Sequence, residues 1–255
     1  MWKGTREYLR THQPARKSMI DIIADIKADE KLSTAAHWDD ENKIRDGLLV
    51  RAKEELVAHT AKWQIHADDD LEAVTAEIIS VCGESSRVEQ LRADSNLSSD
   101  PVHRTQDPHC RMKLTALPAY YTGSALRKDK AIGFDFYYMH NVNASIFYST
   151  FMRQSWISRE NKARILTSHG QYCLAIYASR RSPTLHPEEI VEYTPQCPGS
   201  WQSLFERACK LEDDGHAAKF VRALANGERR CEQYEGRKEF PMREGMWLQF
   251  AHMGK

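Results

Sequence analysis

Two segments of the sequence carry residues whose types and spacing could perform chemistry. In the first, His140 and Asn143 lie three positions apart and share a face if the segment is helical. An imidazole there could bind a metal ion while the amide orients this ligand. The alternative is a core histidine whose ring is satisfied by a neighbour. Both interpretations require a helix through this segment.

The second segment contains His216 and Lys219, again three positions apart and on one face of a helix. A lysine facing inward could titrate, react with carbon dioxide to form a carbamate, or pair with an acid. The alternative is a solvated Lys219 paired with Asp214 or Glu212. Gly215 inside a helix would cost about 1 kcal/mol relative to alanine, so its presence suggests a packing or functional reason.

A third feature is the pair Arg180 and Arg181. Guanidinium groups could hold an anionic or phenolate substrate. The alternative is a solvated helix end, where cations oppose the negative end of the dipole. The histidines outside the first two segments show no ligand spacing among themselves. The six cysteines form no CxxC pair, which is typical of buried thiols rather than a zinc ribbon.

In most of the segments that must position these side chains, apolar residues recur at helical intervals. Few segments alternate with period two, and no repeat of fixed period occurs. The sequence therefore predicts an all-α fold, organised as a single irregular helical domain. The expected helices cover a segment with Pro14 in its first turn that runs to Ile26, Asp40 to Trp63, a segment starting near Asp69, Phe134 to Met152, a segment capped by Ser158, a short helix opened by His186 to Glu189, and Ser200 to Ala225, which Asn226-Gly227 stops.

The chain divides into three parts by composition. Residues 1–82 contain the N-terminal helices, and residues 119–255 form a helical region that carries the candidate site. Residues 83–118 are rich in serine and dotted with proline, which indicates a disordered insert. This stretch is either a surface loop or a retained intron. We expect residues 1–82 and 119–255 to pack as one domain.

Composition excludes several classes of function. Lysine plus arginine and aspartate plus glutamate balance at 36 each, so charge favours neither nucleic acid nor an anionic membrane as a partner. The charged N-terminus has no signal-peptide pattern, and no apolar run has the length of a membrane helix. We expect a soluble, cytoplasmic protein. The sequence has no GxGxxG motif, so a flavin or nicotinamide fold is not indicated. It also has no Walker A, HExxH or GxSxG motif, which disfavours nucleotide hydrolysis, zincin-type proteolysis and α/β-hydrolase chemistry.

Four stretches together resemble the questin oxidase family, oxidoreductases of fungal aromatic polyketide metabolism. The resemblance implies an all-helical fold and an oxygen-dependent oxidation that opens or expands a ring of an anthraquinone-like substrate, in Baeyer–Villiger fashion or by cleavage. The matching stretches are Trp38 to Arg51, Gly133 to Met152, Trp156 to Arg181 and Leu211 to Gly227.

The resemblance also implies roles for individual residues. His140, His216 and Lys219 fall on family positions that could hold non-haem iron, with a carbamate on Lys219 as the anionic ligand. The aromatic polyketide substrate would contact four residues of the neighbouring segments, Tyr138, Asn143, Phe147 and Arg180. A metal-independent oxidase that consumes NADPH is the other mechanism that the family suggests.

Family members are longer at the N-terminus, and that portion resembles the source of further histidine ligands. The chain is therefore expected to be a partial copy of a larger helical fold. A truncated, non-catalytic helical protein or an interaction module is the alternative function. The sequence does not indicate the oligomeric state.

Overall fold

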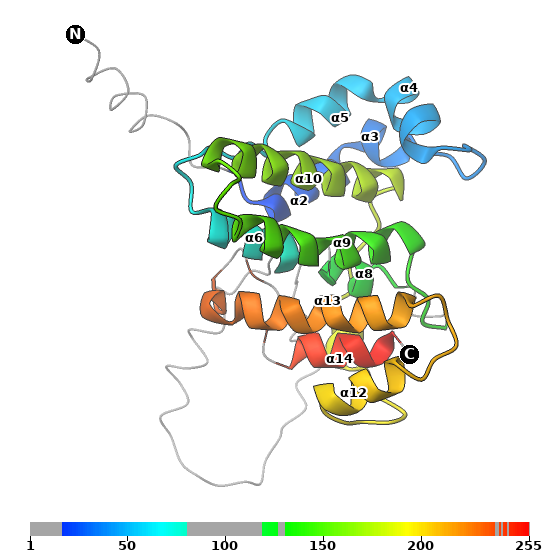
Figure 1. Ribbon diagram of the computed structural model, residues 1–255. Coiled ribbons are helices and arrows are strands. Elements are labelled where there is room, and N and C mark those ends of the chain that lie inside the picture. Colours follow the sequence, from blue (N-terminus) through cyan, green and yellow to red (C-terminus); the bar gives the residue numbers. More distant parts are fainter. Residues whose placement is uncertain are drawn as a thin grey trace, which may run out of the picture.

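The computed structural model describes residues 17–80, 119–126, 131–237, 240, 242–243 and 245–254, and all regular structure in these ranges is helical (Figure 1). The all-α prediction is confirmed. The predicted insert at 83–118 lies outside the described residues. The helices are α2 Met19–Ala28, α3 Glu30–Thr34, the π-helix η1 Lys43–Leu48, α4 Leu49–Arg51, α5 Lys53–Thr60, α6 Leu71–Ser80, α8 Ala119–Ser124, α9 Phe136–Met152, α10 Arg159–Ser179, α11 Glu188–Val191, α12 Trp201–Ala208, α13 His216–Cys231, the 3₁₀ turn η2 Glu232–Tyr234 and α14 Met246–Met253.

The helices form three stacked layers (Figure 1). α10 packs on α2 and α5 in one outer layer, and α9 packs beside α6 and α8 in the middle. α13 packs on the other side of α9 and is itself covered by α12 and α14. α9 therefore lies between α10 and α13, so residues of the two chemical segments can meet where α9 touches α13. None of the helices in the described ranges combines the length and apolar character needed to cross a bilayer.

The contact between the N-terminal helices and α10 depends on a small residue. Gly170 on α10 faces the ring of Trp63, which is fully buried. The Trp63 indole N–H donates a hydrogen bond of 3.2 Å to the carbonyl of Leu166 on the same helix. The backbone N–H of Ile65 donates to the Thr167 hydroxyl at 3.0 Å. The segment after α5 is thus fixed to α10 by polar contacts as well as by burial.

The predicted single helix from Asp40 to Trp63 is wrong in its continuity. The chain forms η1, α4 and α5, with a break at Ala52, whose φ and ψ are −146° and 41°. The Arg51 guanidinium reaches back to the carbonyl of Ala35 at 2.6 Å and to the Asp40 carboxylate. These contacts between distant residues tie the break to α3, and apolar spacing alone does not show them.

The predicted helix from Ser200 to Ala225 is wrong at both its middle and its end. It is divided into α12 and α13, and Gly215 stands just before α13 with a φ of +82°, rather than inside a helix. This left-handed conformation is the reason for a glycine there. The helix also continues through Gly227, where a Cβ would lie 2.6 Å from Trp247 Cη2. Gly227 therefore serves close helix packing and not helix termination.

Other helix starts are close to their predicted positions. Ser158 caps α10, because its hydroxyl accepts from the backbone N–H of Asn161 at 3.3 Å, as predicted. α9 begins two residues later than predicted, after Asp135. α6 begins at Leu71, and the carboxylate that accepts its first N–H groups belongs to Asp70 instead of Asp69.

Candidate functional site

The structure brings His140 of α9 and His216 of α13 together. Their ring centroids are 5.2 Å apart and the rings are nearly perpendicular. The ring of Phe136 packs edge-on against His140 at 4.3 Å and lies 5.8 Å from His216. His140 is exposed and His216 is half-buried, so the pair lies at the molecular surface. The two histidines therefore face one another where α9 contacts α13, outside the buried core.

The start of α13 holds His216 in place. The Asp213 carboxylate accepts from the backbone N–H groups of Gly215 at 2.8 Å and Ala217 at 2.9 Å, which lowers its pKa. The neighbouring Asp214 carboxylate is hydrogen-bonded to His216 Nδ1, and this bond lowers the pKa of Asp214. An aspartate on one ring nitrogen is the arrangement that orients an imidazole whose other nitrogen binds a metal.

Lys219 is exposed and its side chain turns back towards the start of α13. Its Nζ donates to the backbone carbonyl of Asp214 at 3.3 Å. The carboxylate of Asp214 is occupied by His216, so the predicted alternative of a Lys219–Asp214 pair takes the form of a hydrogen bond to the carbonyl. The amine therefore lies beside His216, with no salt bridge among the described residues to hold it there.

Arg180 has two partners at the start of α9. Its guanidinium forms an ion pair of 2.9 Å with Asp135 and stacks on the ring of Tyr137 at 4.4 Å. Asp135 also accepts from the backbone N–H groups of Tyr137 and Tyr138, at 3.0 and 3.2 Å. Arg180 thus connects the end of α10 with the cap of α9, which positions the aromatic residues of the first α9 turn.

The other predicted substrate-binding residues lie on different faces of α9. The ring of Tyr138 is buried 4.2 Å from the ring of Tyr121, on the core side. Phe147 is 55% exposed, on the same side as His140. The amide oxygen and nitrogen of Asn143 are both buried, and neither has a hydrogen-bond partner among the described residues. Of these three residues, Phe147 and Asn143 accompany His140, and Tyr138 belongs to the core.

Replacing Asn143 with leucine is expected to raise the free energy of unfolding by about 1–3 kcal/mol, because burying an unsatisfied polar group costs this much. Leucine has the same branched skeleton, with two methyl groups in place of the amide oxygen and nitrogen, and needs no partner. Thermal unfolding followed by circular dichroism measures the effect, and Asn161→Leu at the exposed start of α10 provides the control. A destabilised Asn143→Leu protein would show that the amide is satisfied in solution.

A second group of residues with potentially reactive side chains was not predicted from the sequence. His169 on α10 is 5% exposed, and its ring stacks on Tyr148 of α9 with centroids 3.9 Å apart. Its only polar contact among the described residues is with Cys173 Sγ, at 3.6 Å from Nε2. Burial lowers the pKa of His169 to about 4, so the ring is neutral. The four-residue spacing of His169 and Cys173 was the available signal in the sequence.

His169 also lines a shallow groove of about 390 Å³ between α9 and α10. Burial raises the pKa of Cys173 to about 12, which keeps this thiol protonated and unsuited to nucleophilic attack. His169 therefore belongs to the wall of the groove with Cys173 packed behind it, and the pair is not a catalytic dyad. The remaining lining residues are Tyr148, Arg164, Ile165, Ser168 and Tyr172.

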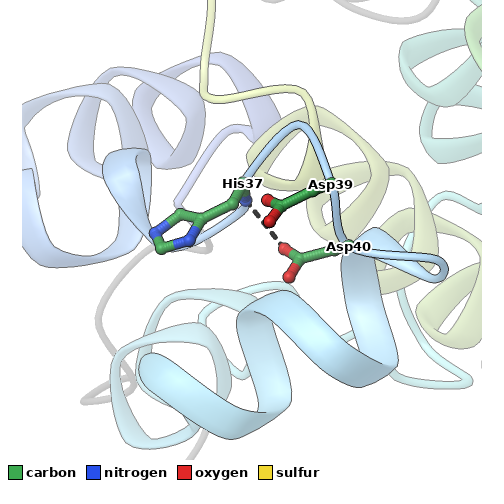
Figure 2. A group of neighbouring side chains, drawn as sticks. All are labelled: His37, Asp39 and Asp40. Carbon is green, nitrogen blue, oxygen red and sulfur yellow. Dashed lines mark hydrogen bonds between the residues drawn. The ribbon is translucent and has the colours of Figure 1, made fainter.

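One group of three metal-ligand side chains occurs in the described part of the chain. His37, Asp39 and Asp40 have ligand atoms within 4.8 Å of one another (Figure 2). The Asp40 carboxylate, however, accepts from the backbone N–H of His37 at 2.7 Å and is paired with Arg51, which lowers its pKa. These contacts give the carboxylate a structural role in holding the loop before η1, and we assign no metal to it.

Comparison with known proteins supports the resemblance. The sequence profile of the Questin oxidase-like family matches residues 3–224. The chain is 34% identical over 244 residues to Baeyer-Villiger monooxygenase dmxR6 of Cryptosporiopsis sp., with 93% of this chain and 47% of that protein covered. It is 31% identical over 241 residues to the questin oxidase of Aspergillus fumigatus, with 92% and 46% covered.

A third relative gives the same result. The chain is 34% identical over 247 residues to the Baeyer-Villiger oxidase AgnL3 of Paecilomyces divaricatus, with 94% of this chain and 46% of that protein covered. The chain thus spans about half the length of the curated relatives it matches. Because the profile covers most of the sequence and the relatives match along nearly all of it, the chain belongs to the questin oxidase-like family.

Proposed function

We propose that this chain takes part in the oxygen-dependent oxidation of an aromatic polyketide, by ring opening or a Baeyer–Villiger-like step, at the surface where α9 meets α13. The observation that carries the proposal is the pairing of His140 with His216 beside exposed aromatic rings, in a member of a family whose relatives are named as questin and Baeyer–Villiger oxidases. The substrate class that we propose is an anthraquinone-like molecule, as the resemblance of the sequence implies.

The separation of the two histidine rings supports a shared metal ion. Imidazoles bound to one ion through metal–nitrogen bonds of about 2.1 Å have ring centres about 4.5–5.5 Å apart. The centroids of His140 and His216 are 5.2 Å apart. Lys219 lies one turn beyond His216, and its carbamate would add an anionic oxygen. Imidazole nitrogen with anionic oxygen is a ligand set that suits non-haem iron(II) with open positions.

Bound iron would supply the activation of dioxygen that a closed-shell aromatic ring requires. The residues of this chain perform the other tasks. Asp214 orients His216, and the exposed rings of Phe136 and Phe147 offer flat apolar contact on either side of His140.

The proposal predicts that the purified chain, loaded with iron(II) without oxygen and then desalted, retains stoichiometric iron. His140→Ala and His216→Ala are each expected to lower the retained iron about tenfold or more, because each removes a ligand. His66→Ala, at an exposed histidine outside the site, is the control. His37→Ala tests the acidic group near η1. Elemental analysis of the desalted protein gives the iron content.

Activity distinguishes the remaining mechanisms. Oxygen uptake with questin as substrate should require iron and should stop with a chelator. Uptake that survives the chelator and requires NADPH would favour the metal-independent oxidase. An iron content at background level in the unmodified protein, together with no oxygen uptake with either iron or NADPH, would contradict the proposal. This result would favour a non-catalytic helical protein.

A further inference from the structure

A small cavity lies between α12, α13 and α14, apart from the His140–His216 surface. Its volume is about 120 Å³. The three helices enclose it because α12 and α14 both pack on α13 and on each other. Its walls are mainly aliphatic, formed by Leu204, Ala208, Leu211, Ala217, Val221 and Ala251, with Arg207, His252 and Gly254 completing the lining.

The two polar side chains in the wall are already paired. His252 Nε2–H donates to the carbonyl of Gly199 at 2.9 Å, which leaves Nδ1 as an acceptor for Arg207 at 3.3 Å. A buried water needs about two to four polar partners, and a roomy apolar cavity without them stays dry. The cavity therefore favours an apolar occupant over water.

The volume limits the size of that occupant. A dry, aliphatic cavity of about 150 Å³ holds xenon or a single benzene ring. Sites for drug-sized ligands measure about 300–1,000 Å³. At about 120 Å³ the cavity fits a diatomic gas or one xenon atom and excludes a fused three-ring substrate. Its wall includes Leu211, which is 47% exposed, so one margin lies close to solvent.

We propose that this cavity binds dioxygen, the co-substrate of the oxidation. Dioxygen is apolar and partitions from water into aliphatic surroundings. Ala217 lines the cavity and directly follows His216 in α13, so an occupant lies behind the helix turn that carries the histidine. The part of the proposal that concerns the co-substrate rests on the proposed function, and the binding of an apolar gas does not.

Xenon tests the binding separately from catalysis. Under a few atmospheres of xenon, the methyl NMR signals of Leu204 and Val221 should shift in proportion to pressure. Ala208→Leu, which fills the cavity from α12, should abolish these shifts, and Val221→Ile should reduce them if the first variant fails to fold. Ala218→Leu, next to the cavity-lining Ala217 but not itself in the wall, is the matched control and should leave the shifts unchanged.

Absence of xenon shifts at these methyl groups in the unmodified chain would overturn the binding site, whether or not the chain oxidises anything. In active protein, Ala208→Leu should raise the KM for dioxygen about threefold or more while the KM for the aromatic substrate stays constant. Xenon binding with an unchanged KM for dioxygen would overturn the co-substrate role. Failure of the proposed function alone would leave the xenon result intact.

Discussion

The Gly170→Ala protein is expected to lose about 3 kcal/mol of its free energy of unfolding, at the upper end of the range for overpacked cores. A Cβ at this position would lie 2.5 Å from Trp63 Cδ1 and 2.6 Å from Met19 Cε, and both side chains are fully buried. Alanine in a helix normally stabilises relative to glycine by about 1 kcal/mol. The close approach of α2 and Trp63 to α10 reverses the sign.

Chemical denaturation followed by circular dichroism measures this loss. Gly133→Ala is the matched control, since its Cβ would meet no atom closer than 4.0 Å, and it should change stability little. The Trp63 hydrogen bond to Leu166 should weaken in the Gly170 variant, which tryptophan fluorescence reports. An unfolding free energy for Gly170→Ala equal to that of the unmodified chain would contradict the packing described for this contact.

The free energy of unfolding is expected to fall by about 3 kcal/mol as the pH drops from about 6.5 to about 4, because His169 is buried as a neutral ring. Burial lowers the pKa of this histidine from 6.5 to about 4 in the folded chain. Below pH 6.5 the unfolded chain binds a proton that the folded chain does not, so protonation favours unfolding. The stability due to the neutral ring is complete above pH 6.5 and is lost as the pH approaches 4.

The His169→Phe variant separates this effect from other titrations. Phenylalanine keeps a ring against Tyr148 but does not titrate, so the slope of stability against pH should become smaller in this window. Carboxylates with a lowered pKa, such as Asp25 and Asp29, begin from a value of 3.8 and lose their contribution below the window. An unchanged slope in the variant would show that His169 is protonated in the fold.

The all-helical class and most helix positions followed from the sequence, because apolar spacing and capping residues act locally. Ser158 shows this, since its hydroxyl caps α10 where the sequence places it. The two helix breaks could not be predicted in the same way. The break at Ala52 depends on Arg51 reaching residues 11 and 16 positions earlier. Gly227 resembles a helix stop, and only its contact with Trp247 explains it.

The residues of the candidate site could be predicted from the sequence, but their contacts across helices and their burial could not. Spacing placed His140 with Asn143 on one helix face and His216 with Lys219 on another, and the family resemblance added their role as possible metal ligands. The pairing itself depends on the packing of α9 against α13, which spacing within either helix does not encode. The burial of His169 is likewise a tertiary effect, which its four-residue spacing from Cys173 suggests but does not establish.

The aromatic face of α9 affects how the chain behaves in solution. Phe136, Tyr137 and Phe147 are each more than half exposed, and Phe151 extends this surface towards the end of the helix. Contiguous apolar surface on a folded protein binds other apolar molecules. Hydrophobic reporter dyes will therefore fluoresce on the native chain, and a bright signal before heating marks this face rather than a loosened core.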